Sequence, residues 1–566
     1  MSIKLPYGIS YFNKLINENY YYVDRTVYIE KLEQASEPYV FFLRPRRFGK
    51  SLFVSMLWHY YGLEFAEQFS QLFGKYYIGQ HPTPKANSYA ILYFEFSRID
   101  TSSKESTFEG FLSNVRWGAK DFLDRYTQLE PSEQKTILSC SYPNEILKAL
   151  FETVGKQHPI YILIDEYDHF ANEILAFNFE PFSEFVSRNG FVRKFYEAIK
   201  EATGRGIVDR FFATGVTPIT LDSLTSGFNI AANFSTHYYF HEMMGFTENE
   251  VETLLKQTAP NLEPQERERV LEDLKKWYNG HIFARKAKIK LYNPDMVLYF
   301  LKEYAYENEY PDTLIDTNIA SDYGKIRRLF SLGKAEHHQV VLEGLIETGK
   351  VEGFLTQQFS FEKEFSKDDF ISLLFYLGLV TIYQTRLSHF QFSFPNYVVK
   401  ELYLEFFIKS LKEQYQLDFE IDDVRDKLEQ LAQENDIKPF VALIEKALQT
   451  LSNRDFISFD EKYINALFVG FASLSNLYFI KSEPEIEQKY PDIMFLYRPP
   501  FAPNYQFLFE LKYLKKTQRS KLKSVQKKAI NQVKDYLAFA EIKRLEHLKS
   551  WVIVFVGEKA EVVEVK

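Results

Sequence analysis

The sequence predicts an α/β protein with a parallel sheet and crossover helices first, a mainly helical middle, and a smaller α/β domain at the C-terminal end. Up to about residue 240, short apolar runs alternate with helical stretches, which is typical of parallel strands joined by helices. Helical periodicity takes over from Gly245, and strand-like runs return after about residue 450. A chain of 566 residues exceeds what one core usually supports, so we expect domains at 1–244, 245–450 and 451–566.

The first sheet is expected to contain four strands. They are YVFFL (39–43), AILYFEFS (90–97), IYILID (160–165) and VDRFFATG (208–215). A helix is expected over residues 51–65, because its apolar side chains recur at helical spacing. The side chains that form this face are Leu52, Phe53, Met56, Leu57, Tyr60 and Tyr61.

The middle region begins with a helix start signal and contains a recognisable element order. Thr247 followed by Glu250 forms a capping box, which opens a helix. Residues 368–407 then predict helix, strand, alternating strand and helix, an order like that of a winged helix. Winged helices often bind DNA, but they also serve as packing modules attached to ATPases. Because this stretch has no basic helix, we favour the packing role.

The C-terminal domain is expected to begin with an amphipathic helix over 460–476. Strand-like runs follow at 490–498 and 505–514, and a basic helix precedes a last strand at 550–557. This amount of chain is normal for a small α/β domain.

The composition favours a folded cytoplasmic protein. The net charge of −9 argues against a generally basic coat that binds nucleic acid, although it can hide a local basic groove. Cys140 is the single cysteine, which excludes an intramolecular disulfide and a cysteine-based zinc cluster and fits a reducing compartment. The first ten residues lack an apolar signal region, and no apolar run is long enough to span a bilayer. We therefore expect no membrane partner.

Residues 44–51 read RPRRFGKS and suggest a phosphate-binding loop. Gly49, Lys50 and Ser51 lie between an apolar strand and an amphipathic helix. In such loops, backbone N–H groups and the helix N-terminus bind phosphate, the lysine adds a positive charge, and the Ser hydroxyl holds Mg²⁺. The same three residues after a strand also occur by chance.

The entry to this loop departs from the standard pattern. A standard loop has glycine at position 44, whereas this chain has Arg44 followed by Pro45, which favours an extended backbone. Arg46 and Arg47 are predicted to compensate by bringing cationic side chains near the phosphates.

Two further strands end in polar residues that suit a nucleotide site. Asp165 and Glu166 follow an apolar strand, where ATPases of the Walker type place a magnesium-associated Asp and a Glu that polarises the attacking water. The alternative is a solvated acidic turn. Thr214 ends another strand and is a candidate sensor of the γ-phosphate, or simply a strand-terminal threonine.

The C-terminal domain contains a second candidate site. Glu510 and Lys512 alternate along one expected strand, so they share a face, and Asp492 joins them if its strand pairs as a hairpin. Hydrolysis of phosphodiesters with Mg²⁺ needs carboxylates around the cation and a positive charge near the attacking water or the phosphate. The alternative is a surface hairpin with an ion pair.

A local excess of positive charge follows this second site. Twelve Lys or Arg residues lie from Lys512 to Lys549, against Asp535, Glu541 and Glu546. Such a run is usually a solvated helix face, but next to the candidate site it favours a polyanionic partner. His169 and His281 are interpreted as turn or core histidines.

Several stretches together resemble a bacterial AAA-ATPase-like family that is often fused to a C-terminal PD-(D/E)XK nuclease domain. They are PYGISYFNKLINENYYYVDRTVYIEKL, FFLRPRRFGKSL, ILIDEYD, ATGVTPI, WYNGHIF and YNPDMVLYFL, together with the P-D and E-x-K residues of the C-terminal domain. In that family the loop usually reads R-P-R-R-F-G-K-S, so the missing glycine is a family trait.

The resemblance implies roles for individual residues. It implies ATP binding at Gly49, Lys50 and Ser51 and a Walker B pair at Asp165 and Glu166. It also places Glu461, on the helix before the second site, where such nucleases often carry another metal-associated Glu, and it matches Gln532 and Tyr536 on a later helix. YVDRT (22–26) matches without an assigned role, and a polar turn before a helix is the alternative.

We therefore predict a protein in which the ATP state gates metal-dependent cleavage of nucleic acid. The expected cofactors are ATP and Mg²⁺, with Mn²⁺ an alternative at the nuclease site, and DNA is favoured over RNA. The alternatives are a nucleotide-gated signalling or interaction module and a protein-remodelling ATPase, each with an inactive nuclease domain. The oligomeric state stays open, with a homo-oligomer as one alternative.

Overall fold

The computed structural model describes residues 3–154, 157–172, 190–218, 228–316, 335–359, 365–452, 460–482 and 490–566. The chain forms two compact units, each built from separate segments. The first unit contains residues 1–305, 315–342 and 350–397, and the second contains residues 306–314, 343–349 and 398–566. The region 245–450 is thus shared between the two units.

The first unit contains a five-stranded parallel sheet in the order β2-β3-β4-β1-β5. Its strands are β1 (Tyr39–Leu43), β2 (Ala90–Glu95), β3 (Ile160–Asp165), β4 (Val208–Gly215) and β5 (Ala232–Asn233). Every residue of β3 is buried, as expected for a central strand covered on both faces. The α/β prediction is confirmed, and β5, a two-residue edge strand, is an addition to it.

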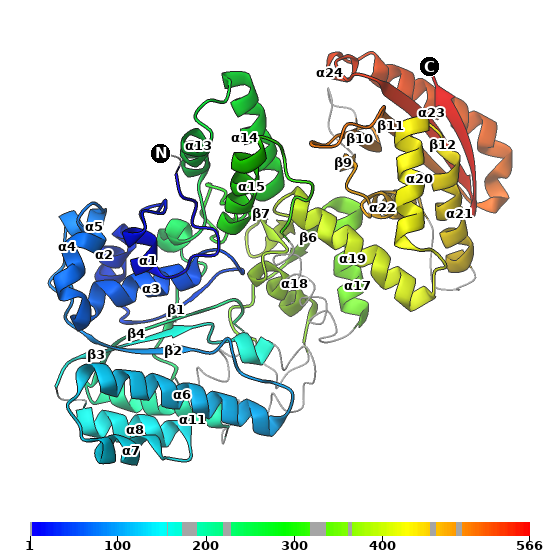
Figure 1. Cartoon of the computed structure of the whole chain (residues 1–566). Coiled ribbons are helices and arrows are strands. Elements are labelled where there is room, and N and C mark those ends of the chain that lie inside the picture. The colour runs from blue at the N-terminus through cyan, green and yellow to red at the C-terminus, as the bar shows by residue number, and fades with distance from the viewer. Residues whose placement is uncertain are drawn as a thin grey trace. The chain divides into compact units, whose positions relative to one another are not determined.

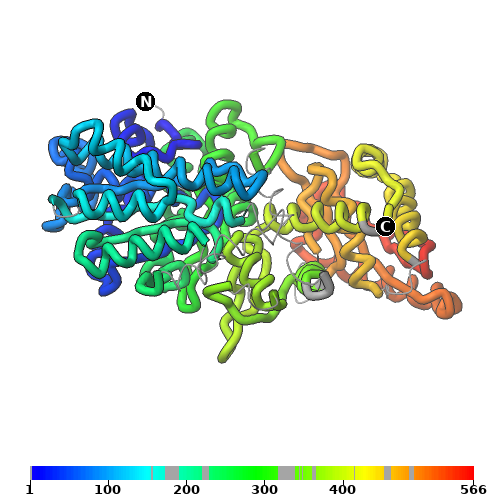
Figure 2. Tube along the Cα trace, turned by 90° about the horizontal axis from the view of Figure 1, so that it is seen from below, coloured from blue at the N-terminus to red at the C-terminus, as the bar shows by residue number. Residues whose placement is uncertain are grey.

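Helices cover both faces of this sheet (Figure 1). On one face, α6, α8 and α11 pack side by side, with α7 beside them (Figure 2). Their bounds are α6 (Lys104–Tyr126), α7 (Pro131–Leu138), α8 (Pro143–Val154) and α11 (Phe191–Gly204). On the other face lie α1 (Phe12–Asn17), α2 (Val27–Gln34), α3 (Lys50–Tyr61), η1 (Leu63–Gln68), α4 (Phe69–Phe73) and α5 (Tyr77–Gln80).

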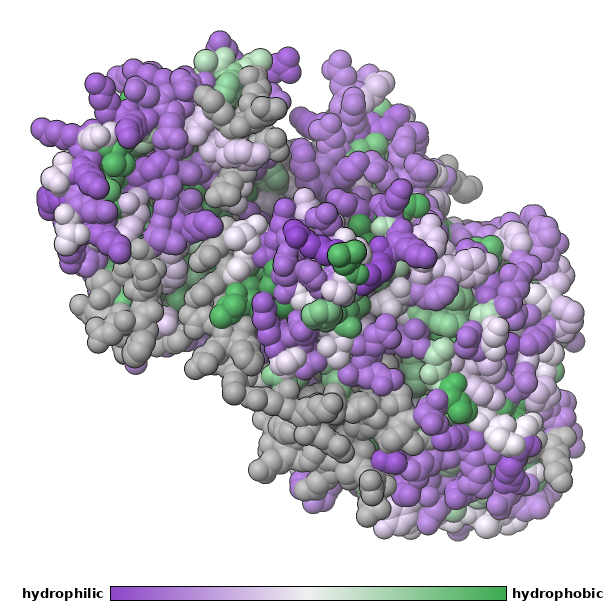
Figure 3. Space-filling view, turned by 180° about the vertical axis from the view of Figure 1, so that it is seen from behind, coloured by the Kyte–Doolittle hydropathy of each residue, from purple (hydrophilic) through white to green (hydrophobic). Residues whose placement is uncertain are grey.

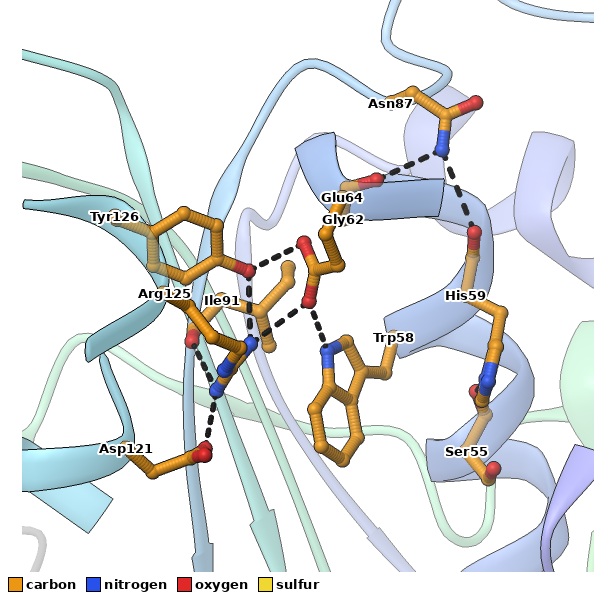
Figure 4. Close-up of polar contacts among 10 residues, drawn as sticks. All are labelled: Ser55, Trp58, His59, Gly62, Glu64, Asn87, Ile91, Asp121, Arg125 and Tyr126. Carbon is orange, nitrogen blue, oxygen red and sulfur yellow. Dashed lines mark hydrogen bonds and ion pairs between the residues drawn. The ribbon is translucent and has the colours of Figure 1, made fainter. Parts of the chain in front are cut away.

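A polar network around Arg125 joins the helices of the two faces at the sheet edge (Figure 4). Arg125, near the end of α6, donates to Glu64 Oε1 at 2.8 Å, and Trp58 Nε1 donates to the same oxygen at 2.8 Å. Arg125 also donates to the carbonyl of Ile91 in β2 at 3.4 Å. The guanidinium lies 4.9 Å from the Trp58 ring, so ion pair, hydrogen bonds and ring contact support one another.

The rest of the first unit is mainly helical and ends in a small sheet. Its elements are η2 (Tyr238–Met243), α13 (Glu248–Thr258), α14 (Pro264–Tyr278), α15 (Pro294–Glu307), α17 (Ala335–Thr348), β6 (Lys350–Gly353), α18 (Lys367–Tyr376), β7 (Thr381–Thr385), β8 (Phe390–Ser393) and the start of α19 (Tyr397–Tyr415). The last two residues of α15 and the second part of α17, from residue 343, belong to the second unit. The Thr247–Glu250 capping box forms as predicted. The order α18, β7, β8, α19 confirms the predicted winged-helix-like order, and β6 adds a third strand beside β8.

The second unit contains a five-stranded sheet in the order β13-β12-β11-β10-β9. Only β11 and β12 pair in parallel. Its elements after α19 are α20 (Ile421–Glu434), α21 (Lys438–Ser452), α22 (Glu461–Ala472), β9 (Tyr478–Ser482), β10 (Ile493–Tyr497), β11 (Gln506–Leu514), η4 (Lys516–Lys521), α23 (Leu522–Leu537), α24 (Ala540–Lys543), β12 (Leu548–Val556) and β13 (Lys559–Val565). The predicted α/β class is confirmed, and the chain adds edge strands β9 and β13.

On the face seen in Figure 3, the coloured residues are mainly hydrophilic, and the hydrophobic ones form small separate groups. Every helix in the described part of the chain is too short or too polar to cross a bilayer.

Candidate functional sites

A cavity of about 450 Å³ opens beside the loop between β1 and α3 in the first unit. This volume lies within the range of about 300–1,000 Å³ that is usual for small-molecule sites. The lining residues come from four parts of the unit: the N-terminal segment, the loop itself, the end of β3, and the region from η2 to α15. They include Ile9, Tyr21, Tyr22, Arg25, Arg46, Arg47, Gly49, Lys50, Ser51, Glu166, His169, Met243, Met244, Phe246, Asp295 and Leu298.

The loop leads into α3 through Gly49. Gly49 adopts φ +91°, a left-handed conformation that suits glycine, and α3 begins at the next residue. Lys50 is 6% exposed, and its Nζ donates to the carbonyl of Pro45 at 3.0 Å. Burial lowers the pKa of the Lys50 ammonium, an effect opposed by the carboxylates of Glu166 and Asp165. A buried lysine at a helix N-terminus suits an anionic ligand.

Arg44 lies at the position where the standard loop has glycine, and its buried side chain supports the loop through hydrogen bonds to backbone carbonyls. The guanidinium donates to the carbonyls of Ser235 at 2.7 Å and His241 at 3.1 Å, and also to those of Leu43 and Phe240. It lies 4.3 Å from the rings of both Phe42 and Phe283. Burial lowers the pKa of Arg44 to about 9. Arg44 is therefore part of the loop's support and does not line the cavity.

Arg46 and Arg47 line the cavity, and their role near the phosphates stays a prediction. Arg47 adopts φ +68°, and its Nη1 lies 3.3 Å from Oδ2 of Asp295, which follows the first residue of α15. The carbonyl of Arg46 accepts from Asn293 Nδ2 at 3.3 Å. The loop is thus tied to the start of α15.

The end of β3 places two carboxyl groups near the loop. Ser51 donates a hydrogen bond to Asp165, and burial raises the pKa of Asp165 to about 6 although this hydrogen bond favours the carboxylate. Glu166 lines the cavity with φ +52°, an uncommon conformation for a residue with a side chain. Its Oε2 lies 3.3 Å from His169 Nδ1. A hydroxyl beside a carboxylate fits the oxygen ligands that Mg²⁺ prefers.

Thr214 lies inside the sheet. Its side chain is fully buried, and its hydroxyl donates to the carbonyl of Phe42 at 2.7 Å. Its role as a γ-phosphate sensor stays a prediction, and the observed hydrogen bond is what a strand-terminal threonine would make.

Three residues near the cavity were not assigned by the sequence. Tyr22 and Arg25, in the YVDRT stretch, line the cavity, and Arg25 donates to Glu250 Oε2 at 2.8 Å and to the carbonyl of Gly245 at 2.6 Å. Asp168 is buried and accepts from the backbone N–H of Thr217 at 2.6 Å, which fixes the loop after β4. The resemblance marked these stretches, but no residue pattern gave their roles.

The second unit brings Asp492, Glu510 and Lys512 together as the sequence predicts. Asp492 immediately precedes β10, and the antiparallel register of β10 with β11 places it opposite Glu510. Asp492 Oδ2 accepts from the backbone N–H of Leu511 at 2.7 Å. The Lys512 Nζ lies 3.0 Å from Glu510 Oε1 and 3.4 Å from Asp492 Oδ2.

Glu461 joins this cluster from the first residue of α22. The Lys512 ammonium donates to Glu461 Oε1 at 2.9 Å, so one lysine contacts three carboxylates. Burial alone would lower the pKa of Lys512, but the attraction of Asp492, Glu510 and Glu461 outweighs it and raises this pKa. Burial raises the pKa of Asp492 to about 6, and burial together with the Asp492 charge raises that of Glu510 to about 7.

One oxygen of the cluster fits a divalent cation. Glu510 Oε2 is buried and has no hydrogen-bond partner among the described residues, so a lone pair is left for another ligand. Asn465 Oδ1, one turn along α22 from Glu461, is in the same state. In the described part of the chain, however, no three His, Cys, Asp or Glu side chains are grouped closely enough to hold a metal ion by themselves. The donor chemistry fits the cation, and Lys512 lies among the donors.

Helix α23 closes one side of the cluster. Tyr536 donates to the carbonyl of Tyr490 at 3.3 Å, and burial, together with Glu510 and Asp492, raises its pKa to about 12. Gln532 is exposed. The basic residues predicted after the site lie mainly on η4 and α23.

Comparisons with known proteins match both units. Residues 6–225 match a family model described as predicted AAA-ATPase, and residues 459–565 match one described as PD-(D/E)XK nuclease superfamily. The chain is 28% identical over 327 residues to an uncharacterized protein in the vnfD 5′ region of Azotobacter chroococcum mcd 1, with 55% of each protein covered. It thus spans about half the length of that relative. A solved Walker-type ATPase of Pyrococcus abyssi is 12% identical, with a TM-score of 0.38 over 67% of this chain and 94% of that one.

Proposed function

We propose that this chain, which carries an AAA-ATPase-like domain and a PD-(D/E)XK nuclease-superfamily domain, binds and hydrolyses ATP in its first part and cleaves nucleic acid in its last. In this proposal the nucleotide state gates the cleavage. The functional regions are residues 1–244 for the ATPase, 245–450 for the lid and winged-helix-like region, and 451–566 for the nuclease.

The ATPase proposal is supported by the residues that meet at the 450 Å³ cavity. On binding, Lys50 exchanges the Pro45 carbonyl for a phosphate oxygen, and the α3 N-terminus and Gly49 present backbone N–H groups to the same anion. Ser51 and Asp165 are the residues that would hold Mg²⁺, which neutralises charge on the phosphates. Glu166 lines the cavity and orients the attacking water, with His169 fixing its carboxylate.

The observation that carries the nuclease proposal is the contact of Lys512 with Asp492, Glu510 and Glu461 around an unpartnered Glu510 oxygen. Mg²⁺ or Mn²⁺ would draw Asp492, Glu510 and Glu461 closer together than they lie here, and it would supply an activated water and stabilise charge on the phosphate. Lys512 places its ammonium beside that water or the scissile phosphate. The basic residues of η4 and α23 bind the phosphate backbone, with DNA favoured over RNA.

The same cluster also favours a second candidate. Because Lys512 contacts all three carboxylates, the domain also suits a nucleotide-gated interaction module that holds a partner and does not cut it. A protein-remodelling ATPase belongs to the same alternative.

The test is cleavage of labelled single-stranded and duplex DNA and RNA with Mg²⁺ or Mn²⁺, with and without ATP. Lys512→Ala should abolish cleavage, whereas Lys559→Ala, an exposed and ion-paired lysine of the same unit, should not. Lys50→Ala should abolish ATP binding and alter cleavage only when ATP is present. If wild type binds ATP but cuts no substrate with either metal, the interaction module replaces the nuclease.

A further inference from the structure

A second surface of the first unit has the composition of a nucleic-acid interface. It consists of loop 285–290, strand β6 with Phe354, and the hairpin of β7 and β8 from 381 to 390, and we name it the wing surface. The loop lies beside the hairpin, since Thr385 Oγ1 donates to the Arg285 carbonyl at 3.3 Å and Arg285 Nη1 donates to the Leu387 carbonyl at 3.4 Å. Residues about 100 positions apart in sequence thereby form one surface.

This surface is strongly positive in an acidic protein. It carries six cationic side chains, namely Arg285, Lys286, Lys288, Lys290, Lys350 and Arg386, and one acidic side chain, Glu352. The chain as a whole has a net charge of −9. Among the described residues, Lys286, Lys288 and Lys290 are exposed and form no ion pair.

The single acidic residue is already engaged. Glu352 lies 3.5 Å from Arg386 Nε and 3.6 Å from His389 Nε2, and it accepts from Gln391. The charge of the three lysines of loop 285–290 is therefore left for an external anion. A local excess of this kind attracts a polyanion even when the whole protein is acidic.

Exposed rings accompany these charges. Tyr383 is 55% exposed and Phe354 is 52% exposed, although large aromatic side chains are usually buried. Lys350 Nζ lies 4.1 Å from the Tyr383 ring, and Arg285 lies 4.6 Å from that of Phe390. Leu387, at the hairpin tip, is fully exposed. A cavity of about 340 Å³ lies among Phe283, Arg285, Phe354 and Phe390.

We propose that the wing surface binds a single-stranded segment of nucleic acid, with phosphates on loop 285–290 and bases stacked on Tyr383 and Phe354. Cations that follow a backbone and rings that accept any base are what sequence-independent binding of single strands requires. This proposal rests on the proposed function in one respect, namely that the strand bound by the wing surface is the substrate of the nuclease domain. It also reverses our preference for packing as the role of this region.

An anionic membrane would meet the same charges, and its interface also accepts aromatic rings. The rings are interleaved with cations, which favours a ligand that presents bases and phosphates in alternation. A membrane is therefore an outcome of the test and not part of the proposal.

The main experiment measures binding of a fluorescein-labelled single-stranded oligothymidylate to the full chain in EDTA, so that cleavage is absent. The triple variant Lys286→Gln, Lys288→Gln, Lys290→Gln should bind about tenfold more weakly, with a shallower salt dependence because each lost phosphate contact reduces the slope by about 0.7. The matched variant Lys104→Gln, Lys120→Gln, Lys135→Gln changes the net charge equally on α6 and α7 and should bind like wild type.

The stacking part has its own variant and its own probe. Tyr383→Ala with Phe354→Ala should weaken binding of oligothymidylate by about fivefold or more, because stacking on one ring contributes about 1–3 kcal/mol per base. The same variant should bind an abasic strand of equal length as wild type does. Equal loss with both probes would overturn the stacking assignment.

Wild-type affinity of both variants for oligothymidylate would overturn the proposal. Variants that lose binding to phosphatidylserine vesicles but keep wild-type affinity for oligothymidylate would also overturn it. The thermal unfolding midpoint of each variant checks that it folds. Should they fail to fold, photo-crosslinking of wild type to a strand containing iododeoxyuridine decides, because crosslinks must fall on Tyr383 or Phe354. Binding is measured without metal, so the two proposals can fail separately. If the protein binds the strand through the wing surface but cuts no substrate, only the nuclease proposal is refuted. If the protein cuts nucleic acid and the wing variants bind like wild type, only the wing-surface proposal is refuted.

Discussion

Restoring the standard glycine at position 44 should damage the phosphate-binding loop. In most such loops Arg44→Gly would recreate the consensus, but here the guanidinium donates to four carbonyls beneath the loop. Leaving a buried acceptor without a donor costs about 1 kcal/mol or more, so four acceptors give about 4 kcal/mol. The lost contacts with Phe42 and Phe283 add to this, while removal of a buried charge offsets part of it.

The assay is thermal unfolding of the full chain with and without ATP. At about 2 °C per kcal/mol for a large domain, Arg44→Gly should lower the midpoint of the first unit by about 8 °C. ATP affinity should fall as well, because the loop loses its support. Arg98→Gly, an exposed arginine of the same unit, is the control and should change the midpoint little. If Arg44→Gly keeps both the midpoint and the ATP affinity, Arg44 does not support the loop.

Three other changes test separate features. Arg125→Met should destabilise the first unit by about 2–3 kcal/mol, since Glu64 loses its charged partner, and Lys120→Met on the same helix should cost under about 1 kcal/mol in the same thermal assay. Burial lowers the pKa of His281 to about 3. Between about pH 6.5 and pH 3 the unfolded chain therefore binds a proton that the folded protein does not, so the contribution of His281 to stability is complete above about pH 6.5 and decreases as pH falls toward 3. About 2 kcal/mol is lost at pH 5, and His281→Phe should flatten this part of the pH–stability profile. Glu510→Gln should abolish cleavage without changing ATP binding, and cleavage that survives would exclude Glu510 as a metal ligand.

The sequence predicted the central strands and the edge strands β2 and β7, but it missed the edge strands β5, β6, β9 and β13. β1, β3, β4, β11 and β12 are nearly continuous apolar runs because both of their faces are covered. In contrast, β13 reads KAEVVEV and is half-exposed, and β5 has two residues. An edge strand needs fewer apolar residues and often carries charges, so its pattern is weak.

The candidate sites show a similar division between local and distant residues. Glu510 and Lys512 are two residues apart on a strand, and Gly49, Lys50 and Ser51 are consecutive, so spacing alone predicted that each set would act together. Tyr22 and Arg25 reach the cavity from the N-terminal segment, and loop 285–290 reaches the wing hairpin across about 100 residues. The sequence pattern of a single segment does not predict contacts with a segment that is far away in the chain.

The segmented make-up of the two units has a practical consequence for dissecting the protein. Because residues 306–314 and 343–349 belong to the second unit, a fragment starting at 398 would lack two pieces of its own fold. A protease that cuts once between 397 and 398 would give two fragments that stay together without a covalent bond, because residues 306–314 and 343–349 of the N-terminal fragment are part of the second unit. Limited proteolysis should therefore yield a nicked protein whose fragments separate only after denaturation. An experiment that transfers the second unit to another protein needs to include all three of its segments, 306–314, 343–349 and 398–566.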